Sequence, residues 1–100
     1  MKPSELLNTP KKWTRNTLAR DAKGNAVLVH SDSAKSWCLT GSLMKCFPPD
    51  LDSEFCSAIN KLQHEIDKIT FGTFIGIPKW NDDPNGTFEE VRELLIKCNL

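Results

Sequence analysis

The feature that most constrains this chain is a run of apolar residues from Leu51 to Ile69, repeated at the spacing of an α-helix. Successive apolar positions lie four, four, three, four and three residues apart, which places them on one face of a helix. Because an amphipathic helix gains most of its stability from packing, other elements must cover that face. The apolar positions are Leu51, Phe55, Ile59, Leu62, Ile66 and Ile69.

A second helix is predicted over Ala34–Phe47, because apolar residues recur there at spacings of three and four and Pro48-Pro49 ends the run. Ser31-Asp32-Ser33, just before it, offers residues that commonly cap helices. Gly41 lies inside this stretch, where glycine costs about 1 kcal/mol relative to alanine. We therefore expect another backbone to pass close to Gly41.

A third helix is predicted to begin at Thr87. Thr87 and Glu90 form a capping box, in which each side chain accepts a backbone amide of the first turn. Phe88, Val91 and Leu95 then fall on the inner face of this helix.

The N-terminal third predicts a β-hairpin. Residues 14–20 and 26–30 are predicted strands, and Asp21-Ala22-Lys23-Gly24-Asn25 between them supplies the side chains and the glycine that a tight turn needs. Pro3 can open a short helix that ends before Pro10. Residues 71–77 are predicted to be either a short strand or a loop.

The predicted fold is therefore α+β and mainly helical, with the N-terminal hairpin packed on three or four helices in a single domain, residues 1–100. One core is expected from the inner faces of the helices: Trp37, Leu43, Phe55, Ile59, Leu62, Phe88, Val91 and Leu95.

The four cysteines are predicted to be reduced, buried and free of metal. Cys38, Cys46, Cys56 and Cys98 include no C-x-x-C pair, which structural zinc sites usually contain. Cys38 is a weak candidate nucleophile, since His30 and His64 are the only imidazoles and its neighbours are apolar.

The polar stretch after Trp80 partly follows the ligand pattern of a calcium loop. Asn81, Asp83 and Asn85 stand at the first three ligand positions, but the final position holds Arg92 in place of a bidentate glutamate. We expect no calcium site here and no cofactor elsewhere.

The sequence favours a cytoplasmic protein with no membrane span. No apolar run approaches about 18 residues, and the first residues lack the apolar stretch of a secretory signal. Residues 1–30 carry six basic and two acidic groups, whereas residues 31–100 carry seven basic and eleven acidic groups. The basic end either contacts nucleic acid through residues 2–23 or neutralises the acidic remainder, and the second interpretation is favoured.

Three segments together resemble a family of small bacterial and phage proteins of unknown function. They are an A-R-D-x-x-G turn from Ala19 to Gly24, a W-C-x-x-G-[AS] segment from Trp37 to Ser42, and Trp80-Asn81-Asp82-Asp83-Pro84 before Thr87-Phe88-Glu89-Glu90-Val91. Ser42 replaces the commoner alanine of that family. The resemblance implies a bacterial or phage origin and a mixed helical fold, and it implies no reaction.

The favoured functional class is a non-enzymatic protein-interaction or regulatory module, such as a phage or bacterial inhibitor of a host protein. Small size and the lack of an assembled catalytic constellation support it. The alternative is a small-molecule-binding protein or minor enzyme with a ligand cleft. The candidate residues of that cleft are Arg20, Asp21, Trp37, Trp80, Asn81 and Asp82. The polar members can instead bind backbone groups of the turns beside them, and that structural interpretation is favoured.

Overall fold

The computed structural model of the chain describes residues 1–72 and 75–100. It is an α+β structure, mainly helical, with one two-stranded antiparallel sheet, as predicted. The elements in chain order are α1 (Pro3–Leu6), a 3-10 turn (Pro10–Lys12), β1 (Ala19–Asp21), β2 (Ala34–Trp37), α2 (Leu39–Cys46), a 3-10 turn (Pro49–Leu51), α3 (Asp52–Ile69), α4 (Ile77–Asp82) and α5 (Phe88–Lys97).

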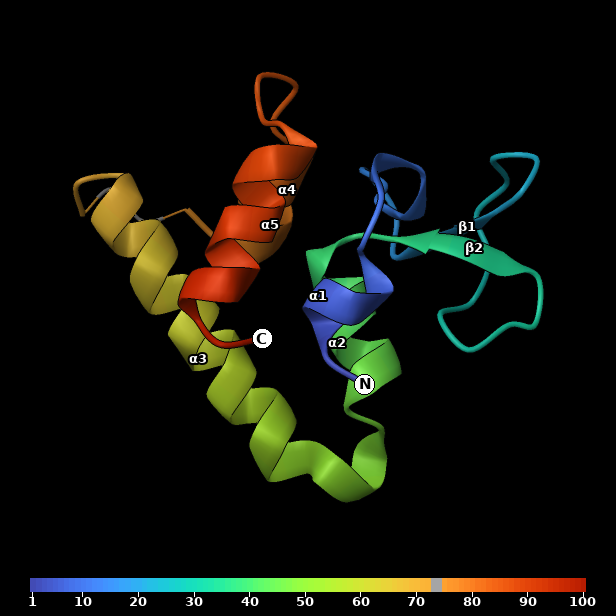
Figure 1. Ribbon diagram of the computed structural model, residues 1–100, viewed down its shortest axis with the longest axis horizontal. Coiled ribbons are helices and arrows are strands. Elements are labelled where there is room, and N and C mark those ends of the chain that lie inside the picture. Colours follow the sequence, from blue (N-terminus) through green and yellow to red (C-terminus); the bar gives the residue numbers. More distant parts are fainter. Residues whose placement is uncertain (73–74) are drawn as a thin grey trace.

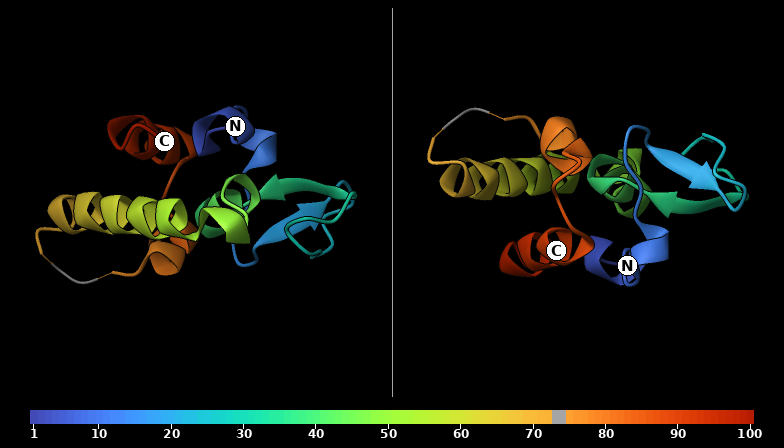
Figure 2. Two further views of the ribbon diagram at one scale, coloured as in Figure 1. Left: turned by 90° about the horizontal axis from the view of Figure 1, so that it is seen from below. Right: turned by 90° about the horizontal axis from the view of Figure 1, so that it is seen from above.

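The elements form a middle layer with helices on both sides. Figure 1 shows the sheet at one end of the molecule, α3 at the other and α2 between them. In Figure 2, α1 and α5 lie on one side of this layer and α4 lies on the opposite side. This arrangement lets α3, the long amphipathic helix, pack against both α4 and α5.

The hairpin differs from the predicted one in both of its strands. The turn after Asp21 forms as expected, with the Asp21 amide donating to the Asn25 carbonyl at 2.9 Å. Beyond it, residues 26–30 make one isolated bridge, Arg20 to Ala26, and then turn away. The partner of β1 is instead β2, with Ala19 opposite Trp37. The predicted strand 14–20 is shortened because Asn16 has a positive φ of 68°, which interrupts extended backbone.

The predicted helix over Ala34–Phe47 is also wrong in its first turn. Ala34–Trp37 is strand β2, and the helix begins only at Leu39. The cap is supplied by the thiol of Cys38, whose Sγ accepts from the Gly41 amide at 3.3 Å, and not by Ser31-Asp32-Ser33. Cysteine is not a usual capping residue, so the local sequence gives little sign of this boundary.

Gly41 lies against another backbone, as predicted. A Cβ atom added at this position would stand 2.1 Å from the carbonyl oxygen of Leu18. That same oxygen accepts the Cys38 amide at 3.2 Å. The absence of a side chain at Gly41 therefore lets the segment before β1 rest directly on the start of α2.

The core follows the predicted helix faces at its centre and departs from them at its edges. Five of the eight predicted core residues are buried, and Phe55, Ile59 and Phe88 are partly buried against them. On α3, the most buried residues are Ala58, Leu62 and Ile66, whereas Ile69 is 46% exposed. The apolar face of α3 is thus covered along its middle and left open at its C-terminal end.

Trp80-Asn81-Asp82, expected in a polar turn, belongs to helix α4. The proline at its second position, Pro78, fits the first turn of a helix. The capping box of α5 is confirmed, with the Thr87 hydroxyl accepting from the Glu90 amide and the Glu90 carboxylate accepting from the Thr87 amide. The question of a strand over residues 71–77 falls partly on residues 73–74, which lie outside the described residues.

The first and last residues of the chain are bonded to each other. The Ser4 amide donates to the Leu100 carbonyl at 3.0 Å, and the Lys2 ammonium donates to the Asn99 side chain at 3.1 Å. Arg92 of α5 also donates to the Ser4 carbonyl. These contacts fasten α1 to α5 across nearly the whole length of the sequence.

Candidate functional site

Asn81 of α4 is the most completely bonded polar side chain of the predicted site. It is 1% exposed, and its Oδ1 accepts from the Trp13 indole at 2.8 Å and from the Leu39 amide at 3.0 Å. Its Nδ2 donates to the Thr14 carbonyl at 3.1 Å and to the Asp82 carboxylate at 3.0 Å. Leu39 is the first residue of α2, so Asn81 satisfies an amide that the helix cannot bond itself.

Asp82 continues this network to the N-terminal loop. Its Oδ1 accepts the Asn16 amide at 2.8 Å, at the residue where the backbone takes a positive φ. The carboxylate therefore supports the bend at Asn16, within the loop before β1.

Arg20 and Asp21 bond the hairpin instead. The Arg20 guanidinium donates to the Thr14 hydroxyl at 2.9 Å, to the Gly24 carbonyl at 2.9 Å and to the Arg15 carbonyl at 3.0 Å. Asp21 accepts the Lys23 and Asn25 amides, both at 2.9 Å. The bond from Asn25 is the main reason that the pKa of Asp21 lies below its usual value.

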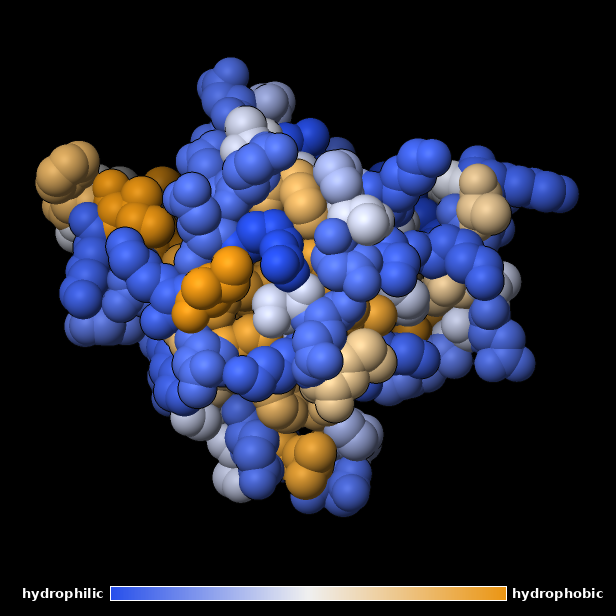
Figure 3. Space-filling model, in the orientation of Figure 1, coloured by the Kyte–Doolittle hydropathy of each residue, from blue (hydrophilic) through white to orange (hydrophobic). Residues whose placement is uncertain are grey.

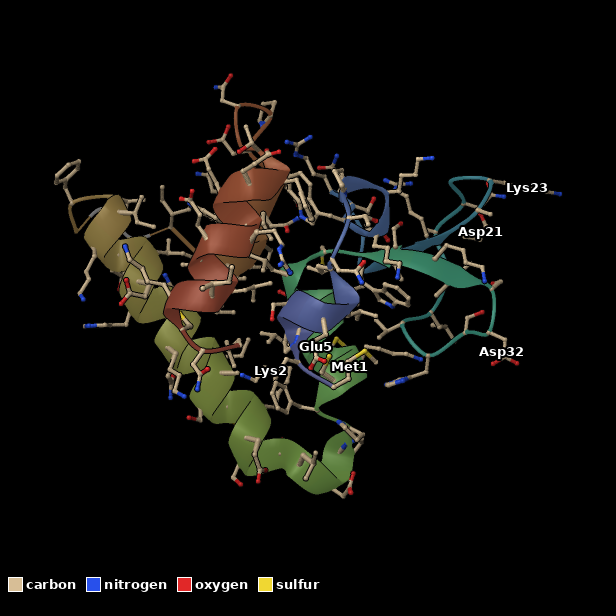
Figure 4. The ribbon with its side chains drawn as sticks, in the orientation of Figure 1. Met1, Lys2, Glu5, Asp21, Lys23 and Asp32 are labelled. Atoms are coloured by element: carbon tan, nitrogen blue, oxygen red, sulfur yellow. The ribbon has the colours of Figure 1, made fainter. Side chains whose placement is uncertain are left out.

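The six predicted site residues are spread over different parts of the described structure. Figure 4 shows Asp21 and Lys23 at the tip of the hairpin, away from α4 and α5. The Trp37 indole donates to the Val29 carbonyl at 3.0 Å and is buried. Trp80, Asn81 and Asp82 line hollows around α4, and the walls of those hollows contain neither Arg20, Asp21 nor Trp37.

An apolar groove lies between the C-terminal end of α3, Trp80 of α4 and the outer side of α5. Its volume is about 480 Å³. Ile69 and Ile96 stand at its edges, 46% and 62% exposed. Figure 3 shows hydrophobic atoms exposed on this face of the molecule, over the end of α3 and over α5. The remaining lining residues are Glu90, Glu93, Leu94 and Lys97. We call this the α3–α5 groove.

A smaller and more polar hollow adjoins the α3–α5 groove. Its volume is about 190 Å³, and Trp80 and Glu90 line both spaces. Trp13, Asp83 and Asn85 are among its other walls. We call it the acidic hollow, because Asp83 and Glu90 are the titratable groups in its lining.

A third hollow of about 480 Å³ lies on another side of Trp80, lined by Ile75, Lys79, Asp82, Asp83 and Pro84. Trp80 is thus the residue common to three surface depressions. Sequence reasoning singled out Trp80 but missed Ile69, Ile96 and Glu93. Ile96 is an apolar residue that lies outside the buried face of α5. An apolar residue on the exposed face of an amphipathic helix is the sequence signal that indicates this surface.

Three of the four thiols form the nucleophilic thiolate less readily than an ordinary thiol. Burial raises the pKa of Cys38, Cys46 and Cys98. Cys56, predicted to be buried, is exposed on α3. Among residues 1–72 and 75–100, no group of three or more His, Cys, Asp or Glu is placed to hold a metal ion.

Fold and site together define a small, mainly helical α+β domain with an apolar groove beside an acidic hollow. The chain belongs to the family of unknown function DUF6197, whose match covers residues 4–98. No curated protein matches the chain, and no solved structure matches it. None of the described helices has the length and hydropathy needed to cross a membrane.

Proposed function

We propose that this protein is a non-enzymatic interaction module that binds another protein through the α3–α5 groove. The observation that carries the proposal is the exposure of Ile69 and Ile96 beside Trp80, which is half-buried and lines all three depressions. Tryptophan is strongly enriched among the residues that dominate binding energy at protein interfaces.

The groove has the composition of an interface core with a charged border. Ile69, Trp80, Leu94 and Ile96 provide its apolar walls, and Glu90, Glu93 and Lys97 provide its charged ones. Apolar residues gathered in a groove with a polar rim are typical of protein-binding surfaces.

A small-molecule-binding protein or minor enzyme that uses Arg20, Asp21, Asn81 and Asp82 is the second candidate. We rank it lower because these side chains already bond the fold: Asn81 makes four hydrogen bonds and Arg20 makes three. Contact with nucleic acid through residues 2–23 ranks third, since Arg15 and Arg20 in that segment donate to backbone carbonyls. A series of binding measurements at rising salt separates that function from the first, because phosphate contacts weaken steeply with salt.

The resemblance of the three sequence segments supports a bacterial or phage origin, and we propose a cytoplasmic location for the protein. On that origin, inhibition of a host protein is the regulatory role that we favour. It rests on analogy with other small proteins of such genomes.

The proposed function is tested by chemical cross-linking and affinity capture from the native host, with three forms of the full chain as bait. We expect one protein to be captured by the wild type and lost with Ile96→Asp, which places a charge in the groove. The matched control is Leu28→Asp, because Leu28 is 83% exposed and lies on the hairpin side of the molecule. Capture that is unaffected by Ile96→Asp, or equally lost with Leu28→Asp, would contradict the proposal.

A further inference from the structure

We infer that the segment bound by this surface presents an apolar side chain next to a lysine or arginine, the apolar group entering the α3–α5 groove and the cation entering the acidic hollow. This inference rests on the proposed function and specifies its partner. The observation behind it is that two spaces of different chemistry share the walls Trp80 and Glu90.

The groove is suited to an apolar side chain. Leu94 is 2% exposed and forms part of the core, whereas Ile69 and Ile96 remain exposed at the edges. A side chain placed between these edges would remove apolar surface from water on both partners, which is the main favourable term in association.

The acidic hollow is suited to a cation for two reasons. Asp83 and Glu90 line it, and among residues 1–72 and 75–100 neither carboxylate has a cationic side-chain nitrogen within 4 Å, since the one such pair joins Lys68 to Glu65. Glu90 uses Oε1 in the capping box, and its negative charge remains.

The aromatic walls of this hollow add a second attraction for a cation. The fold already places one cation on an aromatic ring here, because the Arg15 guanidinium lies 4.5 Å from the centre of the Trp13 ring and donates to the Gly86 carbonyl. Since Arg15 occupies a face of Trp13, Trp80 is the ring that we assign to the cation of the partner.

The charge around Trp80 favours a basic partner over an acidic one. The three depressions that Trp80 lines are bordered by four carboxylates, those of Asp82, Asp83, Glu90 and Glu93. Three cations lie among or beside them: Lys79, Lys97 and, next to the acidic hollow, Arg15. This excess of carboxylates is expected to steer a basic segment toward the surface and to repel an acidic one.

The inference is tested by panning a library of random linear peptides on the immobilised full chain and then measuring the affinity of the enriched peptides as synthetic compounds. We expect the enriched peptides to share a lysine or arginine beside a leucine, isoleucine, methionine or aromatic residue. Glu90→Gln should weaken their binding by about tenfold, the effect of losing one hydrogen bond between two charged groups. Glutamine still serves in a capping box, so this variant keeps the start of α5.

The matched control is Glu89→Gln, which removes the same charge from the neighbouring exposed residue outside both spaces. Ile96→Asp provides a second variant, at an exposed position, that tests the groove without touching Trp80. Melting temperatures of all variants establish that each is folded.

Three results would overturn the inference: no enrichment, enriched peptides without a basic residue, or equal losses with Glu90→Gln and Glu89→Gln. A stable dimer of the chain that competes with the peptides would assign the surface to self-association instead. If the host protein captured through Ile96 contacts the surface with a segment that lacks a basic residue, the inference fails while the proposed function stands.

Discussion

Asn81 joins three parts of the chain that are distant in sequence. Its carboxamide bonds the Trp13 indole, the first amide of α2 at Leu39 and the Thr14 carbonyl, all within a side chain that is 1% exposed. Its place in the sequence, beside two aspartates and before a proline, is that of an ordinary turn residue. Only the fold shows that both the oxygen and the nitrogen of its side-chain amide form hydrogen bonds, because these three partners lie outside α4.

We predict that Asn81→Ala destabilises the protein by about 1–3 kcal/mol, the range for leaving buried partners unsatisfied. Asn81→Asp should be worse at neutral pH, because an oxygen would then replace the donor that faces the Thr14 carbonyl and the Asp82 carboxylate. Burial and Asp82 would raise the pKa of the new carboxyl in the folded state above its unfolded value. The stability of this variant should therefore recover as pH falls and protonation removes the charge.

Urea unfolding of both variants at neutral and acidic pH, compared with the wild type, checks this expectation. If the Asn81→Asp protein is more stable than Asn81→Ala at neutral pH, the Asn81 side chain does not make the hydrogen bonds described above.

At the scale of the elements, the contact between α2 and the loop before β1 depends on a single missing side chain. We predict that Gly41→Ala lowers the free energy of unfolding by about 1–3 kcal/mol, in the range of overpacked interiors, although alanine is the better helix former. The added Cβ would meet the Leu18 carbonyl, and backbone cannot move aside as a side chain does.

Gly76→Ala is the matched control for this prediction. A Cβ at Gly76 would meet only the Pro78 ring, at 3.8 Å, so thermal melting should show little change. If Gly41→Ala melts at or above the wild-type temperature, the loop before β1 does not rest on α2.

Structural features that are indicated by residues close together in the sequence could be predicted. Features that depend on contacts with residues far away in the sequence could not. The α3 periodicity, the α5 capping box, the Asp21 turn and the close approach at Gly41 all follow from neighbouring residues, and the structure confirms them. The start of α2 depends on Cys38 and on Asn81, more than forty residues away, so local spacing extended that helix too far.

The candidate site shows the same limit. The sequence singles out Trp80, Asn81 and Asp82, and of these only Trp80 lines the α3–α5 groove. The groove also requires the end of α3 to lie near α5, which no local sequence pattern predicts. Arg20 and Asp21 are grouped with them because they flank a turn, and Trp37 because it is an aromatic residue of the same three segments. The hydrogen bonds of all three are made within and beside the sheet.

For the whole molecule, the four thiols provide probes of how the domain opens. We predict that a maleimide labels Cys56 first, since it is exposed, and Cys46 next, while Cys38 and Cys98 react only as the protein unfolds. Burial adds to this protection by raising the pKa of Cys38 and Cys98, which keeps their reactive thiolate scarce.

Time-resolved mass spectrometry of the labelled chain checks the order, and the native mass of the unlabelled protein tests for disulfides and metal. We expect the mass of the bare, fully reduced polypeptide. Early labelling of Cys38, a bound metal, or a mass lowered by a disulfide would each contradict this picture.

The bonds that fasten α1 to the last residues also affect how the domain is made. A ribosome releases the N-terminal end first, and Ser4 then has no partner for its amide or its hydroxyl, because both donate to the carbonyl of Leu100. The carbonyls of Ser4 and Leu7, which accept from Arg92, likewise have no such partner until α5 has been synthesised. Contacts between residues so far apart in sequence close late and slowly. The contacts between α1 and α5 can therefore form only after residues 92–100 have left the ribosome, which makes them a late step of folding during synthesis.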